Sequence, residues 1–155
     1  MNIDYPDKGK YLKCLEDIGR LLYRTSCVFQ SIEKDFVRNQ GISTSQATLL
    51  ILLLGSEDNC LNMTKIISEM NLEKSSVTRL IENLLEKGYV EKNKNREDKR
   101  EIKVCLTKSG KIAADKVKNL RMDYYNNILK RLPKGQVREV MNSFEMLLDA
   151  FTEEK

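Results

Sequence analysis

The sequence predicts a mainly α-helical fold with one small β-hairpin, and three patterns lead to this expectation. Apolar residues recur every three or four positions along most of the chain, as they do on one face of an amphipathic helix. Two short segments, 89–93 and 102–106, alternate apolar and polar residues instead, which is typical of strands with one buried face. Gly41, Gly88 and Pro133 interrupt the helical periodicity at the points where helices would have to end.

Four helices are predicted in the first half of the chain. Their ranges are 10–38, 47–54, 63–70 and 74–87, with a short extended piece at 60–62 between the second and the third. The segment 44–46 supplies capping groups for the second helix, which is apolar on nearly every side and therefore central. Asn62 is placed to cap the third helix, and residues 71–73 form a tight turn into the fourth.

The second half begins with the β-hairpin and ends with two helices. A polar loop, 94–101, joins the two strands. Thr107 caps the next helix, which extends to about residue 131, before Pro133 breaks the pattern. A last helix over 137–151 has a continuous apolar seam. The whole chain, 1–155, is expected to form one domain, because its length suits a single hydrophobic core.

Composition excludes several classes of protein. The chain has no histidine, which removes Ser-His-Asp and Cys-His catalysis and the His-containing zinc sites. Neither a Gly-rich phosphate loop nor a Cys-x-x-Cys pair is present, so we expect no enzyme, no metal and no cofactor. Apolar runs are too short to cross a membrane, and the first residues do not resemble a signal peptide, so we expect a cytoplasmic protein.

The four cysteines stand far apart in the sequence, at positions 14, 27, 60 and 105. Cys14 and Cys27 fall on one predicted helix, where 13 residues of rise separate them by roughly 20 Å, beyond the reach of a disulfide. We therefore expect free, half-buried thiols. Cys60 and Cys105 can be neighbours across the small sheet, which makes them a weaker candidate pair for redox chemistry.

Positive charge is concentrated around the hairpin. The formal net charge of the chain is only +4, but the segment 87–111 holds nine basic and four acidic residues. Its local charge of +5 leaves −1 for the rest of the chain, so the positive field is confined to this segment. A solvated surface hairpin and a polyanion-binding surface both account for this pattern.

Two short helices joined by a three-residue turn and followed at once by a charged hairpin form a winged helix-turn-helix. In the second of these helices, Val77, Leu80 and Leu84 mark the buried face. The N-terminal part of the opposite face then presents cations and short hydroxyls, namely Lys74, Ser75, Ser76, Thr78 and Arg79. Such side chains suit phosphates and base edges, so this end of the helix is expected to enter a DNA major groove. Ordinary helix capping by serine and threonine is the alternative use of the hydroxyls.

The hairpin tip, 95–100, predicts a second contact with DNA. An arginine at the end of a two-stranded projection can enter a narrow minor groove, where negative potential is concentrated. Asp98 can hold Arg100 by a charge-assisted contact and so fix its direction. A solubilising turn with a surface ion pair is the alternative. The position of the hairpin directly after the groove-binding helix favours the DNA contact.

Several short segments together carry a family resemblance. They are Ser45-Gln46 at the start of a helix, SSVTRLI at 75–81, LEKGYV at 85–90, DKR at 98–100 and VCLTKSG at 104–110. With them the chain resembles the multiple-antibiotic-resistance regulator (MarR) family, and the order of helices extends the resemblance to essentially the whole chain. The Asp-x-Arg wing and the Leu-Thr-x-x-Gly exit are its most specific parts. Lys99 departs from the family, which most often has a second arginine at that position.

The resemblance implies a ligand-responsive repressor that binds a palindromic double-stranded DNA operator as a homodimer. The region 42–107 would bind DNA, and the helices of 10–38 and 108–155 would interlock two subunits, since their apolar stripes exceed what one small winged domain covers. Family members commonly bind small aromatic or anionic effectors between these parts. The aromatic residues that could line such a pocket, unless they serve core packing, are Tyr11, Tyr23, Phe29, Tyr124 and Tyr125.

Two other functions stay open at the level of sequence. One is a winged domain that binds proteins and has lost its DNA contact. The other is a thiol-based redox-sensing regulator. Relatives that sense peroxide have a cysteine four residues before the tyrosine of a Leu-Leu-Tyr run. Here the run is 21–23 and that position is Gly19, which disfavours the same mechanism.

Overall fold

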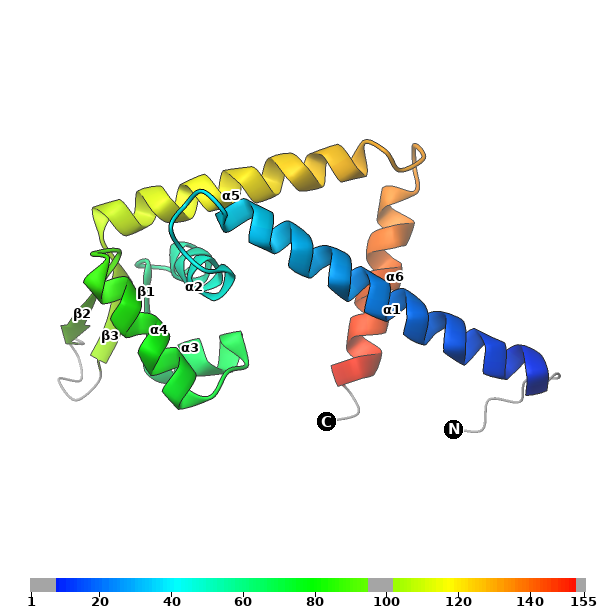
Figure 1. The fold of residues 1–155 in the computed structure, drawn as a ribbon, viewed down its shortest axis with the longest axis horizontal. Helices are drawn as coiled ribbons and strands as arrows, with labels where there is room; N and C mark the ends of the chain where they lie inside the picture. Colours follow the sequence, from blue (N-terminus) through cyan, green and yellow to red (C-terminus); the bar gives the residue numbers. More distant parts are fainter. Residues whose placement is uncertain (1–7, 95–101, 153–155) are drawn as a thin grey trace.

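The structure is a computed structural model that describes residues 8–94 and 102–152. Its elements follow in the order α1 (Lys8–Val37), α2 (Thr44–Leu54), β1 (Cys60–Asn62), α3 (Met63–Met70), α4 (Lys74–Glu86), β2 (Val90–Lys94), β3 (Ile102–Leu106), α5 (Lys108–Leu129) and α6 (Val137–Thr152). Helices α2, α3 and α4 gather with the sheet at one end, and α1, α5 and α6 extend away from them (Figure 1). The predicted fold class, mainly helical with a small β-wing, is confirmed.

Helix α2 begins three residues earlier than the sequence predicted. Its N-cap is Ser43, whose hydroxyl accepts a hydrogen bond from the Gln46 backbone N–H at 3.2 Å. The Gln46 side chain accepts one in return from the Ser43 N–H at 2.9 Å, which completes a capping box. Because this reciprocal pair satisfies two backbone donors, residues 44–46 form the first turn of the helix instead of capping it from outside.

Helix α2 is the centre of the hydrophobic core. Its Leu49, Leu50 and Leu53 are fully buried. Burying a leucine contributes roughly 1.5–3 kcal/mol, so this helix holds its neighbours firmly. The core around it draws on the end of α1, on α3, α4, the sheet and the first half of α5, with Val37, Ile42, Ala47, Ile66, Val77, Leu80, Ile81, Leu84, Val90, Val104, Ala114 and Val117. The winged helix-turn-helix is thus a packed body to which the long helices are attached.

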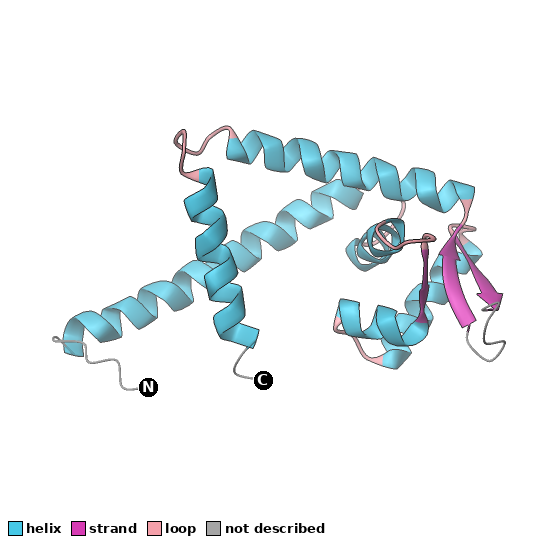
Figure 2. Cartoon of the chain, turned by 180° about the vertical axis from the view of Figure 1, so that it is seen from behind, coloured by secondary structure: helices cyan, strands magenta, loops and turns pink. Residues whose placement is uncertain are grey.

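Three strands form an antiparallel sheet in the order β1-β3-β2 (Figure 2). In its central strand, Cys105 stands opposite Cys60 of β1 on one side and Glu91 of β2 on the other. The adjacent Val104 belongs to the core. Because successive residues of a strand point to opposite faces, Cys105 and its two partners lie on the face turned away from the core.

A close approach between α5 and the start of β2 fixes how the chain leaves the sheet. A Cβ atom on Gly110 would lie 1.8 Å from the carbonyl oxygen of Tyr89, so only glycine fits there. The Thr107 hydroxyl donates to the Gly88 carbonyl at 2.6 Å and accepts from the Gly110 N–H at 3.0 Å. Ser109 donates a second hydrogen bond to the same carbonyl at 2.8 Å. The Leu-Thr-x-x-Gly segment, residues 106–110, therefore forms a joint that fixes the direction in which α5 leaves the sheet.

Aromatic and ionic contacts join α1 to α5. The ring of Phe36 meets Tyr124 edge to face, with centroids 5.5 Å apart, and Tyr125 in the same manner at 6.4 Å. One turn earlier on α1, Glu33 forms a hydrogen-bonded ion pair with Arg121 of α5. Both charged side chains are largely shielded, at 24% and 16% exposure. These contacts hold the C-terminal end of α1 against the middle of α5.

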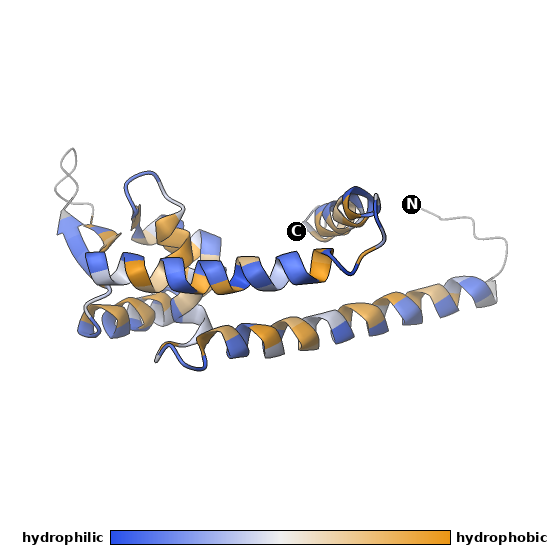
Figure 3. Ribbon diagram, turned by 90° about the horizontal axis from the view of Figure 1, so that it is seen from above, coloured by the Kyte–Doolittle hydropathy of each residue, from blue (hydrophilic) through white to orange (hydrophobic). Residues whose placement is uncertain are grey.

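The rest of α1 and all of α6 leave wide apolar faces uncovered (Figure 3). Within the described residues of α6 none is buried. The exposed apolar side chains include Leu12, Leu15, Ile18, Leu21, Val28 and Phe29 on α1, and Met141, Phe144, Met146, Leu148 and Phe151 on α6. Apolar surface of this extent is typical of an interface with another protein chain. None of the described helices, however, has an apolar stretch long enough to span a membrane.

Candidate nucleic-acid interface

Helices α3 and α4 form a helix-turn-helix whose ends are fixed by local chemistry. The side-chain oxygen of Asn62 caps α3 by accepting from the Lys65 N–H at 2.8 Å, as the sequence predicted. Asn71 ends α3 in the left-handed conformation, with φ of 50°, which asparagine tolerates better than most residues. Gly88, with φ of 67°, lies just past the end of α4. The turn between the two helices therefore takes only three residues, 71–73.

Helix α4 has one buried and one exposed face. Val77, Ile81 and Leu84 are fully buried in the core. The residues that the sequence assigns to DNA binding all lie on the other side, with Lys74, Ser75, Ser76 and Arg79 exposed and Thr78 half-exposed. The Thr78 hydroxyl also donates to the Lys74 carbonyl at 2.8 Å. The fold thus gathers all five residues on the first turns of one helix face.

The first turn of α4 has no side-chain cap. Its N-cap is Glu73, whose side chain makes no capping hydrogen bond. Ser75 and Ser76 lie inside the helix, so their hydroxyls do not cap it, and the alternative use considered from the sequence does not apply to them. The helix start combines free backbone N–H groups with the positive end of the helix dipole, an arrangement that attracts phosphate oxygens.

The tip of the wing, with Asp98, Lys99 and Arg100, lies outside the described residues. The strands that lead to it are described, and they carry further charge. On β2, Lys92 is exposed beside the exposed Glu91, and on β3 Lys103 is half-exposed. The described strands of the wing therefore add the cations of Lys92 and Lys103 to the hairpin, with the carboxylate of Glu91 among them.

A cleft of about 660 Å³ lies between α1, the start of α2, the α3–α4 turn and α5. Phe29, Lys34 and Arg121 are among its lining residues. The Nε atom of Arg121 is buried and has no hydrogen-bond partner in the part of the chain that the structure describes. Burial raises the pKa of the neighbouring Tyr125 hydroxyl, and the negative charge of Glu33 raises it further. The cleft thus offers an aromatic ring, two cations and the Glu33 carboxylate that is paired with Arg121, and Tyr125 lies at the helix junction beside it.

The five aromatic residues assigned to an effector pocket do not share one site within a single chain. Phe29 lies in the lining of the cleft. Tyr124 and Tyr125 pack at the α1–α5 junction beside it. Tyr11 and Tyr23 lie nearer the free end of α1, and Tyr23 is 72% exposed.

Sequence reasoning missed the two cations of the cleft, Lys34 and Arg121. A signal for Arg121 existed, because it stands four residues after Val117 and three before Tyr124, within the apolar stripe of its helix. A cation at such a position has to form an ion pair with a carboxylate or line a cavity. Lys34 carried no comparable signal, since it lies among other charged residues on α1.

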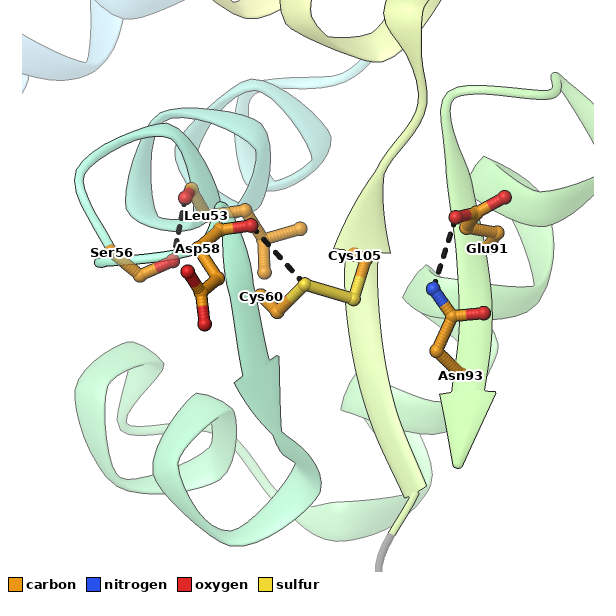
Figure 4. The surroundings of a disulfide bond; sticks show 7 residues. All are labelled: Leu53, Ser56, Asp58, Cys60, Glu91, Asn93 and Cys105. Carbon is orange, nitrogen blue, oxygen red and sulfur yellow. Dashed lines mark hydrogen bonds between the residues drawn. A yellow bond between two sulfur atoms is a disulfide. The ribbon is translucent and has the colours of Figure 1, made fainter. Parts of the chain in front are cut away.

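The expectation of free thiols is wrong for Cys60 and Cys105, although the structure confirms the expectation that these two residues can be neighbours across the small sheet. Cys60 and Cys105 form a disulfide, with their Cα atoms 4.1 Å apart (Figure 4). The pairing of β1 with β3 places these two residues directly opposite each other, a register that the separate segments do not fix. Cys14 and Cys27 are free, the first half-buried and the second exposed. Throughout residues 8–94 and 102–152, no group of three or more cysteine or acidic side chains is placed to hold a metal ion.

Comparisons with known proteins relate the interface to one family. Residues 40–101 match the family model described as the MarR family. The HTH-type transcriptional repressor YetL of Bacillus subtilis is 29% identical over 90 residues, which are 58% of this chain and 54% of YetL. The HTH-type transcriptional regulator PrsX of Escherichia coli is 30% identical over 91 residues, 59% of this chain and 55% of PrsX. The chain thus spans a little over half the length of these curated relatives.

Solved structures share the fold over a longer part of the chain. A MarR transcriptional regulator from Methanosarcina mazei Go1 superposes with a TM-score of 0.74 at 22% identity, covering 90% of this chain and 99% of the other. A mutant MarR from Escherichia coli, complexed with operator DNA, gives a TM-score of 0.72 at 21% identity, covering 85% and 94%. At these identities the likeness establishes the fold.

Proposed function

We propose that this protein, whose winged helix-turn-helix is of the MarR family type, binds double-stranded DNA and regulates transcription. The observation that carries the proposal is the outer face of α4, where two cations and three hydroxyl side chains surround a helix start without a side-chain cap. Such a surface is complementary to phosphates and to base edges in the major groove. The MarR structure complexed with operator DNA, which shares this fold, supports the same use.

In the proposed complex, the N-terminal half of α4 enters the major groove. Arg79 can donate two hydrogen bonds to the O6 and N7 atoms of a guanine, and Lys74 can neutralise a phosphate. Ser75 and Ser76 are short enough to let the helix backbone come close to the bases. Glu82 and Glu86, which are also exposed, lie on the C-terminal half and would be repelled by phosphates. This charge difference along α4 sets which end enters the groove.

The wing supplies the second proposed contact. Arg100 would enter the minor groove beside the site of α4, with Asp98 holding its guanidinium and Lys99 contacting a phosphate. The exposed Lys92 on β2 adds positive charge on the same hairpin. A wing contact of this kind mainly strengthens binding, whereas α4 selects the sequence.

Two copies of the chain would bind together. The uncovered apolar faces of α1 and α6 fit a symmetric interface between two such subunits, in which the helices of 10–38 and 108–155 interlock around a second copy. The region 42–107 then remains free to contact DNA. A two-fold axis relates the two α4 helices, so the expected operator is a palindrome with half-sites about 10 base pairs apart.

The cleft beside Arg121 is the proposed effector site. A small aromatic acid could stack on Phe29 and direct its carboxylate to Arg121 and Lys34. Because the cleft touches both the long helices and the α3–α4 turn, a ligand there would alter the spacing of the two α4 helices and release the operator. This is the behaviour of a ligand-responsive repressor, which works where the DNA is, in the cytoplasm.

The DNA-binding proposal is tested by selecting bound sequences from random duplexes and measuring their affinity by fluorescence anisotropy at fixed salt. Arg79→Ala and Arg100→Ala are each expected to weaken binding by about 1–3 kcal/mol, or roughly 5- to 150-fold. Arg79→Ala should also relax the preference for one base pair, because a guanine contact is lost. Arg100→Ala should weaken binding to all sequences alike.

Arg38→Ala is the matched control, since Arg38 is exposed and its ion pair with Asp35 lies on the surface at the C-terminal end of α1. It should leave the affinity unchanged. A folded protein that selects no duplex, or one whose affinity survives both Arg79→Ala and Arg100→Ala, would contradict the proposal and favour a winged domain that binds other proteins.

A further inference from the structure

We propose that the Cys60–Cys105 disulfide is a reversible redox switch that sets the affinity of the winged helix-turn-helix for DNA. The inference rests on the proposed function, because it concerns the control of that binding. The sulfur atoms of these two cysteines are bonded to each other and link β1 to β3 on the outer face of the sheet (Figure 4).

The two cysteines occupy a pair of positions that keeps their side chains together in either redox state. The Asn59 carbonyl accepts from the Leu106 N–H at 3.0 Å, so these two residues form a hydrogen-bonded pair of the ladder. Cys60 and Cys105 are the next pair, which is non-hydrogen-bonded and therefore has its side chains closest. Since backbone hydrogen bonds hold the strands, the sulfurs stay opposite each other when their bond is open.

The bond closes a loop that contains the proposed DNA-binding elements. The two cysteines are 45 residues apart, and α3, α4 and β2 lie between them. Strand β1 leads directly into α3 through the Asn62 cap, and β3 is the wing strand that pairs with β2. The disulfide therefore ties the start of the helix-turn-helix covalently to the wing.

The surroundings of the disulfide suit both states. Cys105 is 5% exposed, whereas Cys60 is half-buried, so a reagent reaches the Cys60 sulfur more easily. The Sγ atom of Cys60 lies 3.3 Å from the Asp58 carbonyl oxygen, which can accept a hydrogen bond from the thiol once it forms. Cys105 is buried, but neither cysteine belongs to the core cluster, so we expect the packing of that cluster to survive when the bond opens.

The chemistry of the switch balances with a dithiol reductant and hydrogen peroxide. One thiolate of the reductant attacks Cys60 Sγ, the S–S bond breaks, and Cys105 leaves as a thiolate that takes up a proton. The second thiol of the reductant then displaces Cys60 as a thiol, so the reductant becomes a disulfide. In the reverse direction, one protein thiolate attacks hydrogen peroxide and breaks its O–O bond, which gives a sulfenic acid and a hydroxide ion that takes up the proton lost by the thiol and becomes water. The other thiol then attacks the sulfenic sulfur, so that the S–S bond forms and a second water leaves.

The bond is expected to strengthen DNA binding. A protein that acts on DNA works among reduced thiols, where disulfides are usually catalytic or redox-sensing. A covalent tie between β1 and β3 limits the movement of the wing strand relative to α4, so less conformational entropy is lost when both contact DNA. We expect the oxidised protein to bind its operator about three- to tenfold more tightly than the reduced protein.

The test uses the full chain, equilibrated in a series of dithiothreitol buffers of increasing oxidised fraction and, separately, treated with hydrogen peroxide. Alkylation followed by peptide mass spectrometry gives the fraction of Cys60–Cys105 disulfide, and anisotropy on the selected duplex gives the affinity. The affinity should rise with that fraction. The Cys60→Ser/Cys105→Ser variant should bind with the reduced affinity under every condition. Cys14→Ser/Cys27→Ser is the matched control and should keep the full response.

Each of the other possible results contradicts either the redox switch or the proposed DNA binding. Equal affinity of the fully oxidised and fully reduced protein would overturn the switch and leave DNA binding in place. A response that persists in Cys60→Ser/Cys105→Ser, or disappears in Cys14→Ser/Cys27→Ser, would assign it to other cysteines and overturn the switch as well. Absence of binding to any duplex in both redox states would overturn the proposed function itself, and the control of it falls with it.

Discussion

Gly110 and Thr107 show how single residues fix the direction in which the chain leaves the wing. Thr107 uses its hydroxyl twice, as donor to Gly88 and as acceptor from Gly110. This contact draws α5 against the backbone of Tyr89 so closely that no side chain fits at Gly110. Because α5 also packs on α2, the direction of the joint sets how the wing lies relative to the core.

Gly110→Ala is expected to lower the free energy of unfolding by about 1–3 kcal/mol. The added Cβ meets a backbone carbonyl, which cannot move aside as a flexible side chain would. Urea denaturation followed by circular dichroism measures the change. Gly55→Ala is the matched control, because its nearest contacts would be at an ordinary 3.6 Å, and it should alter stability by less than about 0.5 kcal/mol. Equal stability of the two variants would contradict the role of the joint.

Between elements, the α1–α5 junction combines an ion pair with a cluster of aromatic rings. The Glu33–Arg121 pair is shielded from water by its neighbours, and Phe36 packs against both tyrosines of α5. Burial and the Glu33 carboxylate together disfavour a negative charge on Tyr125, so the pKa of its hydroxyl lies above the ordinary 10.0. We therefore expect the junction to lose stability at alkaline pH.

Tyr125→Phe is expected to make the protein less sensitive to high pH. The raised pKa favours the neutral tyrosine in the folded state, and the stability it contributes is fully present below pH 10.0. As the pH rises further, the tyrosine ionises first in the unfolded chain, so this contribution to stability declines. The decline is complete once the pH has passed the pKa of the tyrosine in the folded state. Phenylalanine cannot ionise, so the variant lacks this loss.

Denaturation midpoints measured between about pH 8 and pH 11 test this prediction, since tyrosine has an ordinary pKa near 10. Tyr23→Phe is the control, because Tyr23 is 72% exposed on α1. It should leave the alkaline decline as it is in the unsubstituted protein. If the denaturation midpoints of the unsubstituted protein, Tyr125→Phe and Tyr23→Phe all fell equally with rising pH, the raised pKa of Tyr125 would not contribute to stability.

At the scale of the whole molecule, the exposed apolar faces of α1 and α6 are the basis of the proposed dimer. The winged body has its own core, whereas the described residues of α6 include none that is buried. A cavity of about 430 Å³ between these helices is lined by residues of both, among them Leu21, Val140 and Phe144. A second copy of the chain would cover these surfaces.

Phe144→Asp is expected to convert the proposed dimer into monomers. Phe144 is 54% exposed in one chain, and a carboxylate there would have to be buried in an apolar interface. Sedimentation velocity measures the change, and operator affinity should fall at least tenfold because one subunit offers half of the contacts. Asn142→Asp introduces the same charge at an exposed polar position of α6 and should remain dimeric. A Phe144→Asp variant that sediments as the dimer would contradict this interface.

The sequence by itself determined the elements and the faces they present. The period of apolar residues located α3, α4 and β3, and the residue types at positions 62 and 88 located the cap of α3 and the end of α4. These features depend on neighbours a few residues away, since helix periodicity and capping act over one or two turns. The outer face of α4, with Lys74 and Arg79, followed from the same periodicity because its opposite face is apolar.

The tertiary structure decided which distant residues meet, although the sequence already suggested Cys60 and Cys105 as possible neighbours across the small sheet. Cys60 reaches Cys105 across 45 residues, and Glu33 reaches Arg121 across 88. Neither pairing is encoded in a local pattern, because strand register and helix packing depend on how the whole core closes. The same holds for Gly110, whose close contact with Tyr89 arises only when α5 packs back over the sheet. Helical periodicity thus determined the face of α4 that is proposed to bind DNA. The packing of distant segments determined the close contact at Gly110, and it also determined the disulfide and the cleft that are proposed to control DNA binding.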